Sequence, residues 1–108
     1  GASRVTVEAM TNGIPVIAHR IGSLPEIGGS SIQFVDPPNI KGYRFEGTIM
    51  YPIIDDQDIQ HTATSFARKI TEIDKDYNGF SEQAMEAGLR YCRENEEEFE
   101  RLAKMWII

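Results

Sequence analysis

The sequence predicts an α/β fold, in which short buried strands are combined with helices. Two apolar runs, at residues 16–18 and 32–35, have the length and composition of short strands. The first run follows a segment that reads as a helix, and the second half of the chain carries apolar residues at helical spacing. We therefore expect a helix–strand unit at the start of the chain and several helices after residue 54.

The first helix is predicted over residues 4–12. Ser3 is a residue type preferred at the N-cap, and Gly13 supplies the left-handed conformation that often ends a helix. The start of such a helix leaves backbone N–H groups free to meet an anion or hydroxyl groups. Glu8 lies between one and two turns further along, so its carboxylate is close to the same end.

A short strand and a loop are predicted next. Pro15 prevents the helix from resuming, and the apolar run 16–18 is typical of a strand covered on both faces. The loop 19–23 then lies at the carboxyl end of the strand, where open α/β sheets bind ligands. Ser23 and Glu26 spell a capping box for a one-turn helix, which gives Glu26 a structural role that needs no ligand.

The middle of the chain is predicted to be irregular. After the second strand, at residues 32–35, the segment 36–51 contains prolines and glycines and has no clear period. We expect a long loop with an extended stretch at 48–50. Its length suggests an insertion or a surface flap.

Three helices are predicted for the C-terminal half. Asp55 or Asp56 caps the first, Asn78-Gly79 breaks it, and Ser81 caps the second. The expected buried face of the first helix consists of Ile59, Ala63, Phe66, Ala67, Ile70 and Ile73. The expected inner stripes of the other two are Ala84, Met85, Leu89 and Cys92, and Phe99, Leu102, Ala103 and Trp106. The charged run 94–100 is most simply a solvated face.

Charge and composition exclude several classes of partner. The net charge of −6 argues against nucleic acid and anionic membranes as general partners. The single cysteine, Cys92, excludes an internal disulfide and suits a reducing cytoplasm. No apolar run approaches the ~20 residues needed to span a bilayer. We expect a cytoplasmic protein, and peripheral membrane association of a longer parent protein stays open.

One stretch carries a resemblance to a known family. Glu8-Ala9-Met10, Gly13, Pro15-Val16-Ile17-Ala18, Gly22 and Leu24-Pro25-Glu26 fall in register with a fixed pattern. They resemble the donor-site signature of retaining GT-B glycosyltransferases of family 4 (glycosyl transferase group 1), E-x-F-G-x-x-x-x-E-A-M-A-x-G-x-P-V-I-A followed by G-G-x-x-E. The first glutamate of that pattern would precede Gly1, and Ala2-Ser3 replaces its Phe-Gly. The resemblance implies a partial Rossmann-like doubly wound sheet, an incomplete GT-B C-terminal domain, with C-terminal helices.

The resemblance also implies a substrate-binding site for a nucleotide sugar. It assigns the ribose hydroxyls to the Glu8 carboxylate, and the donor sugar and diphosphate to amides at the helix start. The residues concerned are Ala2, Ser3, Arg4, Val5, Glu8 and Gly22. Two plainer alternatives stay open: Glu8 pairs with Arg4 on the helix surface, and Ser3 closes an ordinary solvated helix end. Arg4 either helps to neutralise the diphosphate or points to solvent.

No catalytic residue, cofactor or metal is expected in this chain. The basic pair that stabilises the leaving diphosphate in the resembling enzymes comes from an earlier part of their chains. His19, His61 and Cys92 lack metal-ligand spacing to one another. His19 lies near the expected site, and His61 belongs to a helix surface.

The resemblance implies that a longer parent protein is a retaining, hexosyltransferase-like enzyme. It would take a UDP-, GDP- or ADP-sugar as donor. A missing N-terminal domain would bind a glycan, lipid or small-molecule acceptor. The present chain would be a single fragment, 1–108, of the nucleotide-sugar-binding domain. It comprises a donor-site unit (1–35), a long loop (36–54) and the C-terminal helices (55–108).

Two expectations follow for the chain by itself. It should lack transferase activity, and it should self-associate because half of a doubly wound sheet exposes a strand edge and apolar faces. The main alternative function is a non-catalytic nucleotide-sugar-binding or scaffolding module. A plain α/β domain with a fortuitous match is the remaining interpretation.

Overall fold

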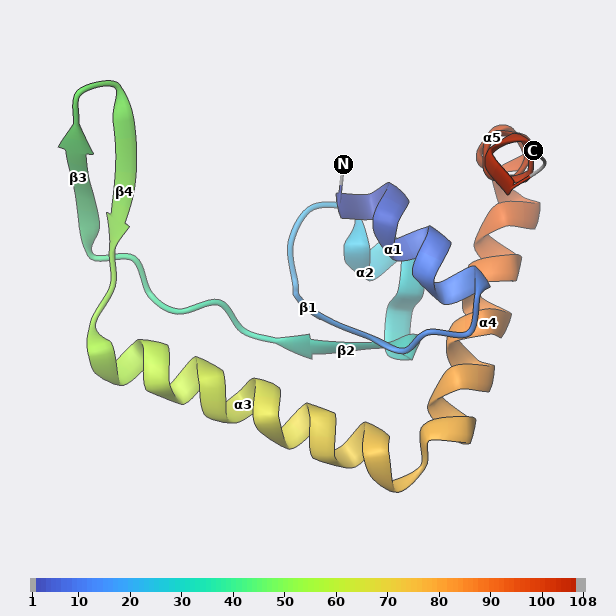
Figure 1. The fold of residues 1–108 in the computed structure, drawn as a ribbon, viewed down its shortest axis with the longest axis horizontal. Helices are drawn as coiled ribbons and strands as arrows, with labels where there is room; N and C mark the ends of the chain where they lie inside the picture. The colour runs from blue at the N-terminus through green and yellow to red at the C-terminus, as the bar shows by residue number, and fades with distance from the viewer. Residues whose placement is uncertain (1, 107–108) are drawn as a thin grey trace.

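The structure is a computed structural model that describes residues 2–106. It is an α/β structure, as the sequence predicts, and it has two sheets of two strands each (Figure 1). The elements in chain order are α1 (Ala2–Thr11), β1 (Val16–His19), α2 (Leu24–Gly28), a 3₁₀ turn η1 (Gly29–Ser31), β2 (Ile32–Val35), β3 (Gly42–Glu46), β4 (Ile49–Ile53), α3 (Asp56–Lys75), α4 (Tyr77–Glu94) and α5 (Glu96–Trp106).

The first sheet consists of the two strands that the apolar runs predict. β1 pairs with β2 in parallel, from Val16 opposite Ile32 to His19 opposite Val35. Nδ1 of His19 lies 2.8 Å from the carbonyl oxygen of Val35, a side-chain bond that ties the two carboxyl ends together. Both predicted strands are confirmed, with β1 one residue longer than expected.

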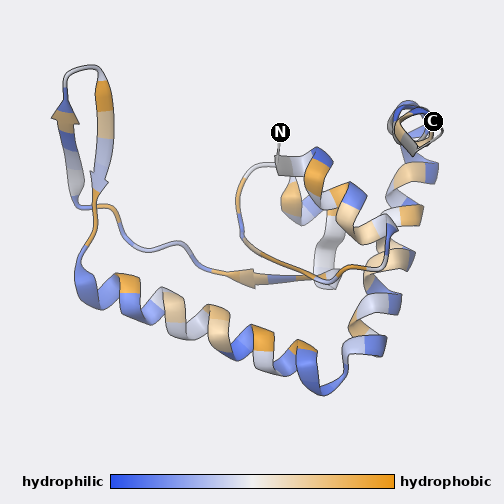
Figure 2. Cartoon of the chain, viewed as in Figure 1, coloured by the Kyte–Doolittle hydropathy of each residue, from blue (hydrophilic) through white to orange (hydrophobic). Residues whose placement is uncertain are grey.

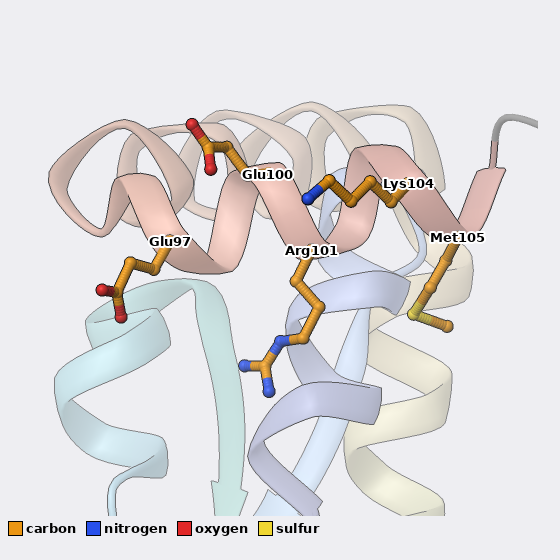
Figure 3. Close-up of a pocket in the computed structure, with 5 residues that line it drawn as sticks. All are labelled: Glu97, Glu100, Arg101, Lys104 and Met105. Carbon is orange, nitrogen blue, oxygen red and sulfur yellow. The ribbon is translucent and has the colours of Figure 1, made fainter.

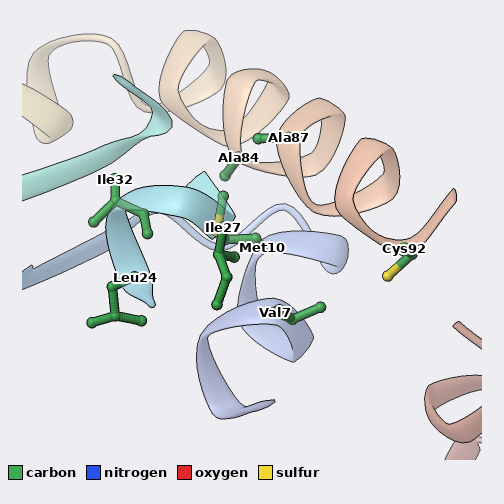
Figure 4. Packing of buried hydrophobic residues seen from close by; sticks show 8 residues of the cluster. All are labelled: Val7, Met10, Leu24, Ile27, Ile32, Ala84, Ala87 and Cys92. Carbon is green, nitrogen blue, oxygen red and sulfur yellow. The ribbon is translucent and has the colours of Figure 1, made fainter. Parts of the chain in front are cut away.

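The core lies between α1, α2, β2 and α4 (Figure 4). Its buried side chains are Val7, Met10, Leu24, Ile27, Ile32, Ala84, Ala87 and Cys92. The helices α1 and α4 approach closely at Gly88, where a Cβ would lie 2.7 Å from the backbone nitrogen of Thr11. Small residues on α4 therefore bring the helix that carries Glu8 against the body of the molecule.

The end of α1 agrees with the prediction, and its start does not. Gly13 has φ 72°, and its N–H and that of Ile14 donate to the carbonyls of Met10 and Ala9 at 2.9 and 3.0 Å. These two bonds form a Schellman motif. The prediction that Ser3 is the N-cap is wrong, because Ser3 is the second residue of a helix that begins at Ala2.

The predicted side-chain caps of α2 and α3 are not formed. Ser23 occupies the N-cap position of α2, but its side chain makes no capping hydrogen bond, so the capping box is wrong. The carbonyl of Ser23 accepts instead from the amide of Glu26 at 3.0 Å. Asp55 is at the N-cap of α3 as predicted, yet its carboxylate pairs with Lys41 rather than with the helix.

The boundary between α3 and α4 lies earlier than predicted. Asp76, not Asn78-Gly79, separates the two helices, and its carboxylate accepts from the amide of Gly79 at 3.3 Å. Ser81 is inside α4 and is not its cap. Its hydroxyl donates to the carbonyl of Gly13 at 2.6 Å, a bond that joins α4 to the end of α1.

The predicted buried faces of the helices are correct only in part. On α3, Ile73 is buried, but Ile59 and Ile70 are 49% and 59% exposed, and Ala63 and Ala67 are exposed too. Figure 2 shows apolar segments along the whole of α3. The helix contacts β1, β2 and α4.

The inner face of α4 is shifted from the prediction. Ala84 and Cys92 are buried as expected, but Met85 and Leu89 are exposed, and Ala87 is buried in their place. On α5, Ala103 is half-buried, and the other side chains of the predicted stripe (Phe99, Leu102 and Trp106) are not among those that the structure describes. Within residues 2–106, the structure has no helix with the length and apolar character needed to cross a membrane.

A β-hairpin occupies the segment that the sequence predicts as a long loop. β3 and β4 pair antiparallel, from Gly42 opposite Ile53 to Glu46 opposite Ile49, around Gly47 with φ 63°. The predicted extended stretch at 48–50 overlaps only the start of β4. Figure 1 shows the hairpin standing clear of the helices, beyond the start of α3.

Candidate functional site

The predicted nucleotide-sugar site begins at the first turn of α1. Ala2, Ser3, Arg4 and Val5 form this turn, and the first amides of a helix have no acceptor within it. Ser3 and Arg4 are half-buried, and Val5 is 66% exposed. The helix start is thus accessible at Val5, and it presents the same four amides that the resemblance assigns to the donor sugar and diphosphate.

Glu8 is held by a neighbour on its own helix. Its carboxylate oxygen Oε1 lies 3.3 Å from Nε of Arg4, and its side chain is 23% exposed. The Glu8 carbonyl accepts from the side chains of Thr11 and Asn12 at 3.0 and 2.7 Å. This geometry matches the plainer alternative, in which Glu8 and Arg4 form an i,i+4 pair on the helix surface.

Gly22 lies in the loop between β1 and α2. It has φ 55°, and no atom lies within 4 Å of where its Cβ would be, so the loop is open at this point. The loop leads directly into Leu24, which shares the core with Val7 of α1. Because Val7 is one turn from the start of α1, this packing keeps the Gly22 loop beside the N-terminal half of that helix.

The last described helix, α5, contacts the same helix start. A guanidinium nitrogen of Arg4 touches the sulfur of Met105. Beside this contact α5 bears a hollow of about 470 Å³ lined by Glu97, Glu100, Arg101, Lys104 and Met105. Figure 3 shows Arg101 and Met105 directed toward α1.

Sequence reasoning did not single out Arg101 and Lys104. The two cations are three residues apart on α5, so they share one face of the helix, and this spacing was the available signal. It was obscured by the acidic run that precedes them, which reads as a solvated face. The sequence also does not show which element this face of α5 lies against, because that depends on the tertiary structure.

Two further hollows lie between β2 and α3. They have volumes of about 400 and 340 Å³ and adjoin, since Phe34 and Lys69 line both. The guanidinium of Arg20 lies 4.9 Å from the centre of the Phe34 ring and 3.3 Å from the Asp36 carboxylate. His61, predicted on a helix surface, lines the smaller hollow. His19 faces α3 nearby, with its ring 5.3 Å from that of Phe66.

Two ionisable groups outside these hollows are perturbed. The hydrogen bond and charge of Asp55 raise the pKa of Lys41 above its usual value. Burial raises the pKa of the Cys92 thiol. In the described part of the chain, no group of three or more His, Cys, Asp or Glu side chains is arranged to hold a metal ion.

The fold and the site together define an α/β protein whose helix start, with an adjacent carboxylate, lies beside a strand-to-helix loop. Comparisons of the chain with protein-family models, with curated proteins and with solved structures give no match.

Proposed function

We propose that this chain is the nucleotide-sugar-binding portion of a retaining GT-B glycosyltransferase, built on part of a Rossmann-like doubly wound sheet. The observation that carries the proposal is the position of Glu8 on α1. Its carboxylate lies one to two turns from a helix start, where the first amides lack helical acceptors. The signature residues are in register around it, with Gly13 ending the helix and Gly22 in the loop after β1.

The chemistry of this arrangement suits a nucleoside diphosphate sugar. Amides at a helix start and the helix dipole favour the negative charge of a diphosphate. A carboxylate has enough lone pairs to accept from two vicinal ribose hydroxyls, and such charge-assisted bonds are the stronger kind. The adjacent hollow is lined by two cations, Arg101 and Lys104, and by two carboxylates, Glu97 and Glu100, so its lining adds no net charge.

The pair between Glu8 and Arg4 is not a barrier to this role. The side chain of Arg4 is 40% exposed, and ion pairs of this kind contribute only about 0–1 kcal/mol. Ribose hydroxyls can therefore replace Arg4 as partners of Glu8 at small cost. The released guanidinium would then be available to the diphosphate.

Calorimetric titration with UDP-, GDP- and ADP-sugars tests the proposal, using the full-length protein that contains this chain. We expect Glu8→Ala to weaken the binding of the preferred nucleotide sugar by roughly tenfold or more, because a hydrogen bond to a charged group is worth about 1.5–3 kcal/mol. The matched control is Glu86→Ala, an exposed glutamate on α4, which should leave the affinity unchanged. Unchanged affinity in Glu8→Ala would remove Glu8 from the site.

A non-catalytic nucleotide-sugar-binding or scaffolding module is the second candidate. The observation in its favour is that the site residues are engaged with each other and with α5, through the Arg4–Glu8 pair and the Arg4–Met105 contact. The two candidates differ in turnover. The first requires transfer of sugar by the full-length protein, and the second requires binding without transfer. In both cases this chain by itself should not turn over a nucleotide sugar.

A further inference from the structure

The β-hairpin exposes large apolar side chains that the rest of the described chain leaves uncovered. Tyr43, Phe45 and Met50 are 50%, 67% and 54% exposed. Because Tyr43 is opposite Pro52 and Phe45 is opposite Met50, all four side chains lie on one face of the hairpin. A two-stranded hairpin is at best marginally stable by itself in water, whereas three or more strands with an apolar face are stable.

The two outer edges of the hairpin are not equivalent. The carbonyl of Ile53 accepts from the amide of Lys41 at 2.8 Å, so Ile53 directs its backbone groups toward β3. Backbone groups alternate in direction along an antiparallel strand, and therefore Met50 and Pro52 direct theirs away from β3. Pro52 has no N–H, which leaves a gap in the outer edge of β4. On β3 the outward residues are Tyr43 and Phe45, and both have an N–H.

The charges on β3 are self-complementary in one register. An antiparallel pairing of β3 with a second copy of β3 must place outward residues opposite outward residues. With Phe45 opposite Phe45 of the second copy, Arg44 is opposite Glu46 of the second copy, and the symmetry makes this pair twice. The neighbouring registers place Arg44 opposite Arg44 or Glu46 opposite Glu46, and like charges directly opposite are destabilising.

We propose that β3 is the edge through which two copies of this chain associate, forming a four-stranded antiparallel sheet centred on Phe45. Among the described residues, β3 pairs only with β4, so its outer edge is open. Within one copy, Arg44 lies 3.6 Å from Glu46 and 5.3 Å from the centre of the Tyr51 ring. On association, the weak Arg44–Glu46 pair within each copy is replaced by two Arg44–Glu46 pairs between the copies. It also brings together two apolar faces that carry Tyr43, Phe45, Met50 and Pro52.

Sedimentation of charge-reversed variants tests the register. We expect the wild-type chain to form dimers with rising concentration. Arg44→Glu or Glu46→Arg alone should raise the dimer Kd roughly tenfold or more, because each places like charges opposite each other twice. The double variant Arg44→Glu/Glu46→Arg should return the Kd to within about threefold of wild type. Arg90→Glu on α4, which changes the net charge by the same amount as Arg44→Glu, is the control and should not alter the Kd.

Cysteine cross-linking tests the symmetry axis. Phe45→Cys places the two new thiols opposite each other, where the Cα atoms of a hydrogen-bonded pair are about 5.5 Å apart, within disulfide range. We expect rapid oxidation to a covalent dimer. Tyr43→Cys should not cross-link, because the register separates its two copies by four residues along the strand, about 13 Å. The wild type controls for Cys92, which is buried.

Three outcomes would overturn the proposal. The first is a wild-type chain that stays monomeric at every concentration, which would assign the hairpin to a different partner. The second is dimerisation that does not respond to Arg44→Glu. The third is equal cross-linking of the two cysteine variants. Circular dichroism checks that each variant keeps the fold. We expect it to do so, because Arg44, Glu46, Tyr43 and Phe45 are all exposed.

Discussion

At Gly13, the turn and the tertiary packing require the same residue. Its φ of 72° is costly for a residue with a Cβ, and the Schellman bonds depend on it. A Cβ at this position would also lie 2.9 Å from the hydroxyl oxygen of Ser81 and 3.2 Å from the terminal methyl carbon of Met85. The helix that carries Glu8 therefore ends where α4 passes over it.

Polar residues at predicted caps are where residue-level prediction fails. Ser81 bonds to Gly13, Asp55 pairs with Lys41, and Ser23 contributes only its carbonyl. A side-chain cap contributes about 1 kcal/mol, similar to any other hydrogen bond or exposed ion pair. Local preference therefore does not decide among partners once distant segments come within reach.

Burial of Cys92 predicts a pH dependence of stability. Because its pKa is raised in the folded state, the thiol of the unfolded chain ionises first, near pH 8.5. The contribution of Cys92 is therefore fully present below that pH and is lost as the pH rises above it. Urea unfolding from pH 7 to 10 should show this loss in the wild type, and Cys92→Ala should lack this part of the decline. Parallel pH profiles for the two proteins would contradict the prediction.

At the scale of elements, periodicity identifies a helix better than it identifies what covers the helix. The spacing of apolar residues correctly predicts α3 as a helix, yet Ile59 and Ile70 on the expected inner face are exposed. The period of 3.6 residues reports which side chains share a face. The period contains nothing about whether another element reaches that face. On α3, Phe66 contacts the His19 ring of β1, whereas Ile59 and Ile70 stay exposed.

The contact between α1 and α4 makes a prediction at this scale. Gly88→Ala would place a Cβ 2.7 Å from the Thr11 nitrogen and 2.9 Å from the Met10 carbonyl carbon. Backbone atoms cannot turn away as a flexible side chain does, so the two helices must separate. We expect a loss of about 1–3 kcal/mol in the free energy of unfolding, despite the better helix propensity of alanine.

Urea unfolding measures this loss. Glu86→Ala, on the exposed side of the same helix, is the control and should change the free energy by less than about 0.5 kcal/mol. Equal stability of Gly88→Ala and wild type would show that α1 and α4 are not in close contact. The position of Glu8 relative to the rest of the site would then need revision.

At the scale of the whole molecule, the chain is more open than a compact domain of its length. The radius of gyration is 16.5 Å, against about 13 Å expected for 100 residues. α3 and the hairpin extend away from the core, as Figure 1 shows. The buried side chains are concentrated around α1, α2 and α4. Apolar contacts therefore stabilise this core more than they stabilise the hairpin and the start of α3.

This uneven packing predicts uneven hydrogen exchange. We expect the slowest amide exchange in α1 and the middle of α4, where Met10, Ala84 and Ala87 are buried, and the fastest in β3 and β4 at low protein concentration. Mass spectrometry after pulse deuteration measures both. Uniform protection across the chain would show that the hairpin and the core unfold as one unit.

The sequence by itself determined the local features: the α/β class, both parallel strands, the glycine stop of α1 and the presence of helices after residue 54. These depend on short-range preferences of a few neighbouring residues, which a single sequence contains. Only the tertiary structure decided that Met105 of α5 touches Arg4 at the start of α1 and that Ser81 of α4 bonds to Gly13 at its end. Those features depend on which distant segments meet. The free energies that separate the alternatives are about 1 kcal/mol each, too small for local sequence to settle.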